Sequence, residues 1–186
     1  MATGIVTTKK KINRIDAGIQ PVDLPYLRFT LSERESLRQL AKSSNVKERR
    51  LCVEYLWLGT YHRQNYKFLV EMCDELIPDR SQYVRAQSLW LLGDFVKDQP
   101  ELVWLQIVKW GSGRNSDIRC GIACYVLEHL LQYHFSKYFP KVKVLIEQGN
   151  NLLANTLSYC WKFGDTKKPA NAKKFDALIK RCGKKL

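Results

Sequence analysis

The chain of 186 residues lacks several features that would place it in a familiar class. No apolar run approaches the roughly 18 residues that a membrane-spanning helix needs, and the basic N-terminus leads into no apolar segment, so we expect neither a membrane span nor a secretory signal. No stretch alternates apolar and polar residues as a strand does, and neither a glycine-rich phosphate loop nor a serine nucleophile elbow is present. These absences exclude the enzymes built on those motifs and predict an all-α fold.

Acidic residues are scarce, with 18 Asp and Glu against 31 Lys and Arg, which gives a net charge of +13. The excess lies at the two ends: residues 1–14 hold four bases and no acid, and residues 162–186 hold nine bases and two acids. We therefore expect a basic arm over 1–25 and one domain over 26–186 with a lysine-rich end. Such ends suit a polyanion, nucleic acid before an anionic membrane, or serve only to keep the protein in solution.

The six cysteines lie scattered through apolar helical patterns, with no export signal to accompany them. We interpret them as reduced, mostly buried thiols of a cytoplasmic protein rather than as a disulfide framework. Cys120 and Cys124, followed by His129 and His134, are residue types that bind zinc. Because His129 comes five residues after Cys124, off the helical i+4 spacing, packed cysteines are the better interpretation. We expect no metal and no cofactor.

Beyond residue 30 the apolar residues are spaced as in helices, beginning with a helix that Thr30 caps. The other helices are expected at 46–58, 66–77, 84–96, 100–110, 118–133, 142–147, 152–162 and 172–182. Val46, Val84, Ile118 and Leu152 superpose, because they follow one another at nearly equal intervals along the chain. A period of roughly 34–38 residues with two helices per unit indicates an α-solenoid of about four repeats after the N-terminal helix.

A hydrophobic residue followed by a base recurs near the start of the first helix of each pair. The copies are Val84-Arg85, Ile118-Arg119 and the weaker Val46-Lys47. Asp79 lies six residues before Arg85, and this Asp…Val-Arg pattern resembles HEAT repeats. Two interpretations stay open: the arginines pair internally with Asp79 and Asp117, or they contact phosphate from an inner surface with help from Lys47 and Lys162.

Four segments carry a resemblance to a known family. They are Leu92-Gly93-Asp94-Phe95, Gln99-Pro100-Glu101-Leu102, Val108-Lys109-Trp110 and Ile118-Arg119. Together with the helix from Leu31 and the segment from Lys47 to Leu51, they resemble the HEAT-like-repeat (AlkD-type) alkylpurine DNA glycosylases over roughly residues 30–170. The resemblance implies a curved, right-handed superhelix of helix pairs that holds duplex DNA on a basic concave face.

Active members of that family excise alkylated purines with two aromatic residues, an aspartate and an arginine. By the resemblance the arginine falls on Arg119 and the second aromatic near Tyr159, whereas Ser81 replaces the first aromatic and Arg85 replaces the aspartate. A guanidinium about 5 Å from a sugar that becomes cationic repels it by roughly 3 kcal/mol at an effective dielectric of about 20. We therefore expect DNA binding with weak or absent base excision.

DNA, duplex or branched, is thus the expected partner, and a protein partner stays open. The expected contacts are Lys47, Arg85, Arg119, Tyr159, Lys162, Lys173 and Lys174. One alternative is an active glycosylase with a rearranged pocket, in which Asp79 or Asp94 supplies the acid. Another is a protein-binding scaffold, in which the arginines pair internally and the lysine-rich ends are solvated.

Overall fold

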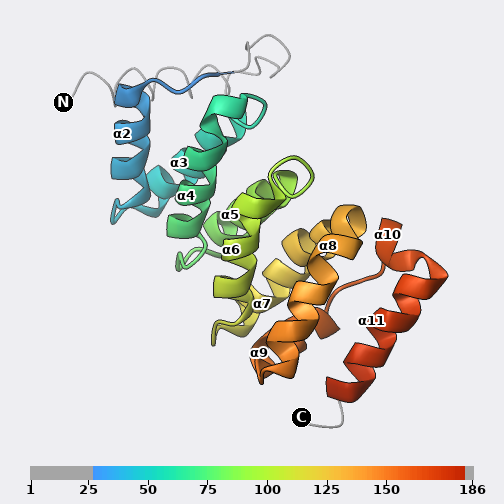
Figure 1. Ribbon diagram of the computed structural model, residues 1–186. Helices are drawn as coiled ribbons and strands as arrows, with labels where there is room; N and C mark the ends of the chain where they lie inside the picture. Colours follow the sequence, from blue (N-terminus) through green and yellow to red (C-terminus); the bar gives the residue numbers. More distant parts are fainter. Residues whose placement is uncertain (1–26, 183–186) are drawn as a thin grey trace. The chain divides into compact units, whose positions relative to one another are not determined.

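The computed structural model describes residues 27–182, which form helices joined by loops and contain no strand (Figure 1). None of the helices in this range is long and apolar enough to cross a membrane. The elements are α2 (Leu31–Ala41), α3 (Val46–Leu58), the 3-10 turn η2 (Arg63–Asn65), α4 (Tyr66–Leu76), α5 (Gln82–Asp94), α6 (Pro100–Gly111), α7 (Ser116–Gly121), the π-helical segment η3 (Ile122–Leu127), α8 (Glu128–Glu147), α9 (Asn151–Ser158), α10 (Gly164–Lys167) and α11 (Pro169–Cys182). The expected all-α class is confirmed for this part of the chain.

The chain divides into two compact units, residues 1–91 and 92–186, and the boundary falls inside α5. Sequence analysis expected one domain over residues 26–186, and both units contribute buried apolar residues within that range. The basic arm expected over residues 1–25, and the lysines at positions 184 and 185, lie outside the described residues.

In the N-terminal unit, α2 packs against α3 and α4. Phe29, just before α2, stacks on Tyr55 with ring centroids 5.7 Å apart and meets Phe68 edge-on at 5.9 Å. The fully buried Asn65 fixes this segment, because its Oδ1 accepts from the Phe29 N–H and its Nδ2 donates to the Leu27 carbonyl. A buried amide is tolerated here because its polar atoms are hydrogen-bonded.

In the C-terminal unit, η3 lies centrally and contacts α6, α7, α8 and α9. Its Ile122 and Val126 side chains are fully buried. The buried Thr156 hydroxyl donates to the Gly111 carbonyl at 2.6 Å and so joins α9 to the end of α6. Helix α11 packs against α9 and α10, which attaches the basic C-terminal helix to this core.

Short polar side chains begin several of these helices. Thr30 and Glu33 form a capping box at α2, which confirms the expected cap. Pro100 occupies the first turn of α6 as expected, where a missing N–H costs nothing. Three asparagines accept from backbone N–H groups of the next helix: Asn45 at α3, Asn115 at α7 and Asn150 at α9.

The stretch from Ser116 to Glu147 was expected to form helices at 118–133 and 142–147; the break after 133 is present as a kink, but the second helix begins directly after it rather than at 142. It runs through α7, η3 and α8 as consecutive helical segments, and α8 is kinked at His134, whose φ of −136° and ψ of 34° are not helical. Phe135, Phe139 and their neighbour Tyr138 are buried, so packing keeps the chain helical after the kink although Pro140 removes a hydrogen bond. Helix α9 ends at Ser158, earlier than the expected position 162.

Candidate nucleic-acid interface

Three arginines make the same contacts near the starts of three helices. Arg49, Arg85 and Arg119 are each the fourth residue of their helix, in α3, α5 and α7 respectively. The Nη1 of each donates to the carbonyl oxygens of the residues six and five positions before it, at 2.8–3.1 Å. Each guanidinium thereby closes the loop that precedes its helix, where carbonyl groups would otherwise need water.

The sequence register placed Lys47, not Arg49, beside Arg85 and Arg119. Helix α3 begins at the expected Val46, whereas α5 and α7 begin at Gln82 and Ser116, two residues before the expected 84 and 118. The fourth residue of α3 is therefore Arg49, and the first copy moves by two residues. Lys47 is exposed in the first turn of α3. The repeated base was therefore present in the sequence, but two neighbouring bases competed for the position.

Arg49 also forms an ion pair with Asp79 of the next loop. Its Nε lies 2.5 Å and its Nη2 3.2 Å from the two carboxylate oxygens, and the Ser81 N–H donates to the same carboxylate at 2.7 Å. Burial alone would raise the pKa of Asp79, but these hydrogen bonds and the positive charges of Arg49 and Arg85 outweigh it and hold the pKa below its usual value. These contacts hold the Asp79 carboxylate within its loop.

The other two arginines are likewise bonded within the protein. Arg85 donates to the backbone carbonyl of Asp79, and its charge helps to lower the pKa of the Asp79 carboxyl. The Arg119 Nη2 donates to the Asn155 side-chain oxygen on α9 at 3.3 Å, where the sequence had pointed to Asp117. The Arg119 side chain is buried, so its guanidinium serves the interior of the C-terminal unit.

The positions matched to the glycosylase pocket are divided between the two units. Ser81 and Arg85 belong to the N-terminal unit, and Arg119 and Tyr159 belong to the C-terminal unit. Tyr159 is 44% exposed at the end of α9, one turn after the residue that Arg119 contacts. Neither unit by itself therefore contains all four matched positions.

The two candidate acids are divided in the same way. Asp79 belongs to the N-terminal unit with its arginine partner, and Asp94 ends α5 in the C-terminal unit. Burial raises the pKa of Asp94, and the neighbouring charge of His129 opposes that shift without cancelling it. Burial lowers the pKa of His129 in turn, partly offset by Asp94. Asp94 and His129 thus form a small titratable pair.

All six cysteines are free thiols, of which Cys52, Cys73 and Cys160 are buried and Cys120 is exposed. Burial is the main cause that raises the pKa of Cys124 to about 11, which keeps this thiol protonated, whereas zinc binds the thiolate. Among residues 27–182, no group of three or more His, Cys, Asp or Glu side chains could hold a metal ion.

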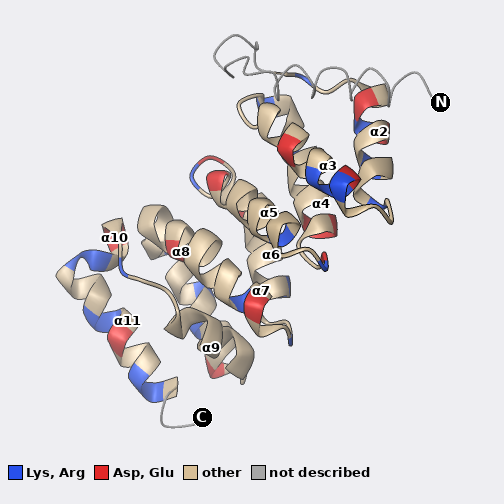
Figure 2. Cartoon of the chain, turned by 180° about the vertical axis from the view of Figure 1, so that it is seen from behind, with Lys and Arg blue, Asp and Glu red and all other residues tan. Residues whose placement is uncertain are grey.

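The remaining expected contacts lie at the basic C-terminal end. Residues 162–182 contain seven Lys and Arg and two Asp. The Lys162 ammonium donates to both carboxylate oxygens of Asp176, at 2.7 and 2.8 Å, so that this lysine is engaged with α11. Lys173 and Lys174, in contrast, are exposed on α11. Figure 2 shows the basic segments of α10 and α11 along the C-terminal unit.

Helix α11 presents two faces. Phe175 and Leu178 are buried against the rest of the unit. Lys173 and Lys180 are exposed and seven residues apart, so they lie one above the other on the outer side. Lys174 and Arg181 have the same spacing along one flank. Asp176 lies between these two lysines on the same outer side and accepts from Lys162. Exposed cations on a helix that an apolar face fixes are suited to follow a phosphate backbone.

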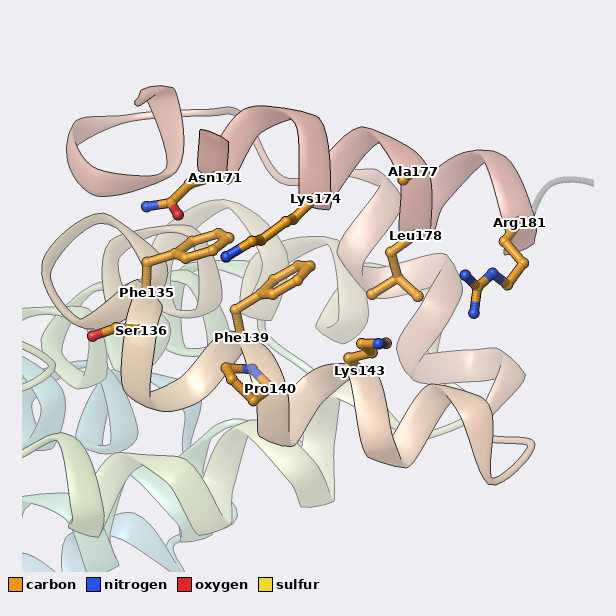
Figure 3. A pocket seen from close by; sticks show the side chains of 10 residues that line it. All are labelled: Phe135, Ser136, Phe139, Pro140, Lys143, Asn171, Lys174, Ala177, Leu178 and Arg181. Carbon is orange, nitrogen blue, oxygen red and sulfur yellow. The ribbon is translucent and has the colours of Figure 1, made fainter. Parts of the chain in front are cut away.

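The flank with Lys174 and Arg181 borders a pocket of about 500 Å³ between α11 and the second half of α8 (Figure 3). Phe135 and Phe139 form its floor, with rings stacked at a centroid distance of 4.5 Å. Figure 3 shows the Lys174 side chain pointing from α11 toward these two rings. Both rings are nearly buried, so they support the pocket and offer little free surface for stacking.

Three cations line this pocket: Lys143 from α8, and Lys174 and Arg181 from α11. One carboxylate partly balances them, since Glu147 accepts from Arg181 at 2.7 Å and lies 3.8 Å from Lys143. The pocket therefore keeps a positive balance, which favours an anionic group such as a phosphate. Its volume is within the range of small-ligand sites.

Sequence reasoning found Lys174 but missed Lys143, Arg181 and the two phenylalanines. The spacing of Lys174 and Arg181 on one helix was available as a signal, but nothing in the sequence placed α8 beside α11. The assembled feature is a basic helix with an adjoining basic pocket, both within the C-terminal unit. No protein-family model, curated protein or solved structure matches this chain.

Proposed function

We propose that this protein binds nucleic acid, with phosphate contacts made mainly by α10, α11 and the adjoining pocket. The observation that carries the proposal is the group of cations on α11, where Lys173, Lys174 and Lys180 are exposed on a helix that Phe175 and Leu178 hold in place. Lysines in this arrangement displace the counterions of a polyanion without reorganising the protein. Duplex or branched DNA is the proposed ligand.

The same proposal includes the architecture. The contacts of Arg49, Arg85 and Arg119 recur at nearly equal intervals along the chain and support HEAT-like repeats stacked as an α-solenoid. In this proposal the loop arginines hold each repeat together. Exposed lysines, rather than Arg85 and Arg119, then make the phosphate contacts.

We further propose weak or absent base excision. The family resemblance puts Arg85 where active glycosylases have an aspartate, and the nearby Asp79 is held by Arg49. Stabilising a cationic sugar needs a carboxylate free to face it. Release of 3-methyladenine or 7-methylguanine from alkylated DNA, lost in Asp79→Asn or Asp94→Asn, would contradict this part of the proposal.

Fluorescence anisotropy with labelled duplex, four-way-junction and single-stranded DNA tests the binding itself. Each phosphate contact contributes about −0.9 to the slope of log affinity against log salt. The double variant Lys173→Ala, Lys180→Ala should therefore reduce that slope by about 2 and weaken binding roughly thirtyfold at about 0.15 M salt.

Lys67→Ala, Lys97→Ala is the matched control, because both lysines are exposed and lie on other elements. This double variant removes the same charge and should retain most of the affinity. Equal losses in the two double variants would mean that net charge alone attracts DNA. Binding that salt does not weaken, or no binding to any of the three DNA forms, would exclude the proposal.

A further inference from the structure

A second concave surface lies in the C-terminal unit, between α6 and the second half of α8, with a volume of about 690 Å³. Its lining repeats the same spacing on both helices once Lys109 on α6 and Lys141 on α8 are counted with the apolar residues. The apolar residues are Trp104, Leu105 and Val108 on α6, and Pro140, Val144 and Leu145 on α8. Residues at i, i+1, i+4 and i+5 share one side of a helix, so two apolar stripes face a common groove.

The groove exposes large apolar side chains. Leu105 is 69% and Val144 is 51% exposed. Neither side chain is needed to fill the core of the unit, which Val103 and Ile107 on the opposite side of α6 already occupy. A continuous apolar surface on two neighbouring helices indicates a binding surface for another molecule.

Two lysines give the groove its charge, Lys109 from α6 and Lys141 from α8, and no carboxylate is among the described residues that line it. Glu101, outside the lining, lies 3.9 Å from the Lys141 ammonium and balances part of that charge. The Lys141 ammonium lies 4.8 Å from the Tyr138 ring centroid and 5.8 Å from that of Trp104. The Lys109 ammonium lies 4.6 Å from the Trp110 ring. Attraction to these aromatic rings favours placement of the two ammonium groups at opposite walls of the groove.

We infer that the groove docks an acidic amphipathic helix of a partner protein. Leucine-like side chains of such a helix, spaced at i, i+3 or i+4 and i+7, would cover Leu105 and Val144, and its flanking carboxylates would meet Lys109 and Lys141. The groove is mainly apolar, so it gives a phosphate backbone little to bind. A second copy of this chain is a poor occupant, because each copy carries a net charge of +13.

This docking site uses α6 and the side of α8 that faces it, whereas the proposed DNA surface uses α10, α11 and the pocket beside them. The two ligands therefore recognise different chemistry, apolar anchors with carboxylates in one case and phosphates in the other. Loss of one activity should leave the other intact. The two proposals can fail separately.

A labelled peptide long enough to form a helix, with leucines along one side and glutamates along both flanks, is the probe. Two further peptides serve as comparisons: one with lysines in place of the glutamates, and one of scrambled sequence. The acidic peptide should bind, and Leu105→Asp or Val144→Asp should weaken it at least tenfold, since a carboxylate then lies in the groove. Leu31→Asp is the matched control, because Leu31 is 84% exposed on α2.

Charge reversal gives the sharper test. Lys109→Glu, Lys141→Glu should weaken the acidic peptide at least tenfold and should strengthen the lysine-flanked peptide, while DNA affinity changes far less than the peptide affinity. Equal binding of the acidic and scrambled peptides, or unchanged binding by Leu105→Asp, would overturn the inference. It would also be overturned by sedimentation equilibrium showing a dimer that Leu105→Asp dissociates, because a second copy would then occupy the groove.

Discussion

Positive charge has different surroundings at the loops and on α11. The loop arginines Arg49, Arg85 and Arg119 each donate to two backbone carbonyls, and Arg119 is buried. On α11, Lys173 and Lys180 are exposed along a helix whose other face is buried. The same sign of charge therefore stabilises local structure in one place and remains accessible to a ligand in the other.

The difference teaches that a recurring base in a repeat is weak evidence for a ligand. Each of these arginines closes the loop before its own helix through two bonds to backbone carbonyls. A charge that a ligand can reach is instead recognised by its position on the side of a helix opposite a buried apolar face. Variants that remove a loop arginine should therefore lower stability with little change in DNA affinity. Variants that remove α11 lysines should lower DNA affinity with little change in stability.

The largest effect is expected for Arg49→Ala. The change removes two hydrogen bonds to Asp79 and two to carbonyls, and it leaves a carboxylate that is only 7% exposed without its cation. Loss of one partner of such a pair lowers the free energy of unfolding by about 3 kcal/mol. Urea denaturation measures the change.

Arg50→Ala is the control for that variant, because the neighbouring Arg50 is exposed and its guanidinium lies 5.2 Å from the Tyr83 ring centroid. Removing this contact should cost no more than about 1 kcal/mol. Equal stability losses in the two variants would mean that the loop contacts of Arg49 have no special weight.

Arg85→Ala comes next. Its two hydrogen bonds to loop carbonyls contribute about 1–2 kcal/mol, so the free energy of unfolding should fall by that amount. DNA affinity should change less than twofold, because the Arg85 guanidinium is engaged with the loop. A thirtyfold loss of DNA affinity at unchanged stability would instead mean that Arg85 contacts DNA. The loop arginines and the α11 lysines would then no longer differ in function.

The loss of stability at acid pH should depend on the protonation of Asp79. Its pKa is lowered in the folded protein, so its contribution is fully present above the usual carboxyl value of 3.8 and is lost as the pH falls through the lower folded value. Asp79→Asn should therefore be less stable than the unmodified protein at pH 5, and the difference should narrow toward about pH 2–3. Melting temperatures across this range test the trend, and a constant difference would contradict it.

The smallest effect is expected for Lys162→Ala. The Lys162 and Asp176 side chains are 38% and 59% exposed, so solvent screens their ion pair despite distances of 2.7 and 2.8 Å. Exposed pairs of this kind contribute at most about 0.5–1 kcal/mol. A loss of stability comparable to that of Arg49→Ala would show that α11 depends on this contact for its position.

Much of the helical structure could be predicted from the sequence. Thr30 and Pro100 mark their helix starts through capping and fixed φ, which are local effects that neighbouring residues decide. Gly149, which adopts a φ of +98° beyond the end of α8, also follows from local geometry. Because these effects are local, the presence and approximate bounds of the helices could be predicted from the sequence.

The site was less accessible, because it depends on contacts between distant segments. The break after residue 133 was expected and is present as the kink at His134, but the sequence did not show that a helix resumes directly after it and carries Phe135 and Phe139 into the pocket lining. Arg49 was overlooked because the pattern of a hydrophobic residue followed by a base fits Val46-Lys47, whereas Arg49 follows Glu48. The two-residue error came from the starts of α5 and α7, which lie two residues before the expected positions.

The π-helical segment Ile122–Leu127 has one more consequence. Its wider turn holds one residue more than an α-helical turn, and a shorter chain would return it to α-helical winding. Removing one residue here would take out that surplus residue and leave Phe135 and Lys143 facing nearly the same neighbours, whereas removing one residue from a regular α-helix such as α9 rotates everything downstream by about 100°. A single-codon deletion in this stretch should therefore be less harmful than the same deletion in α9.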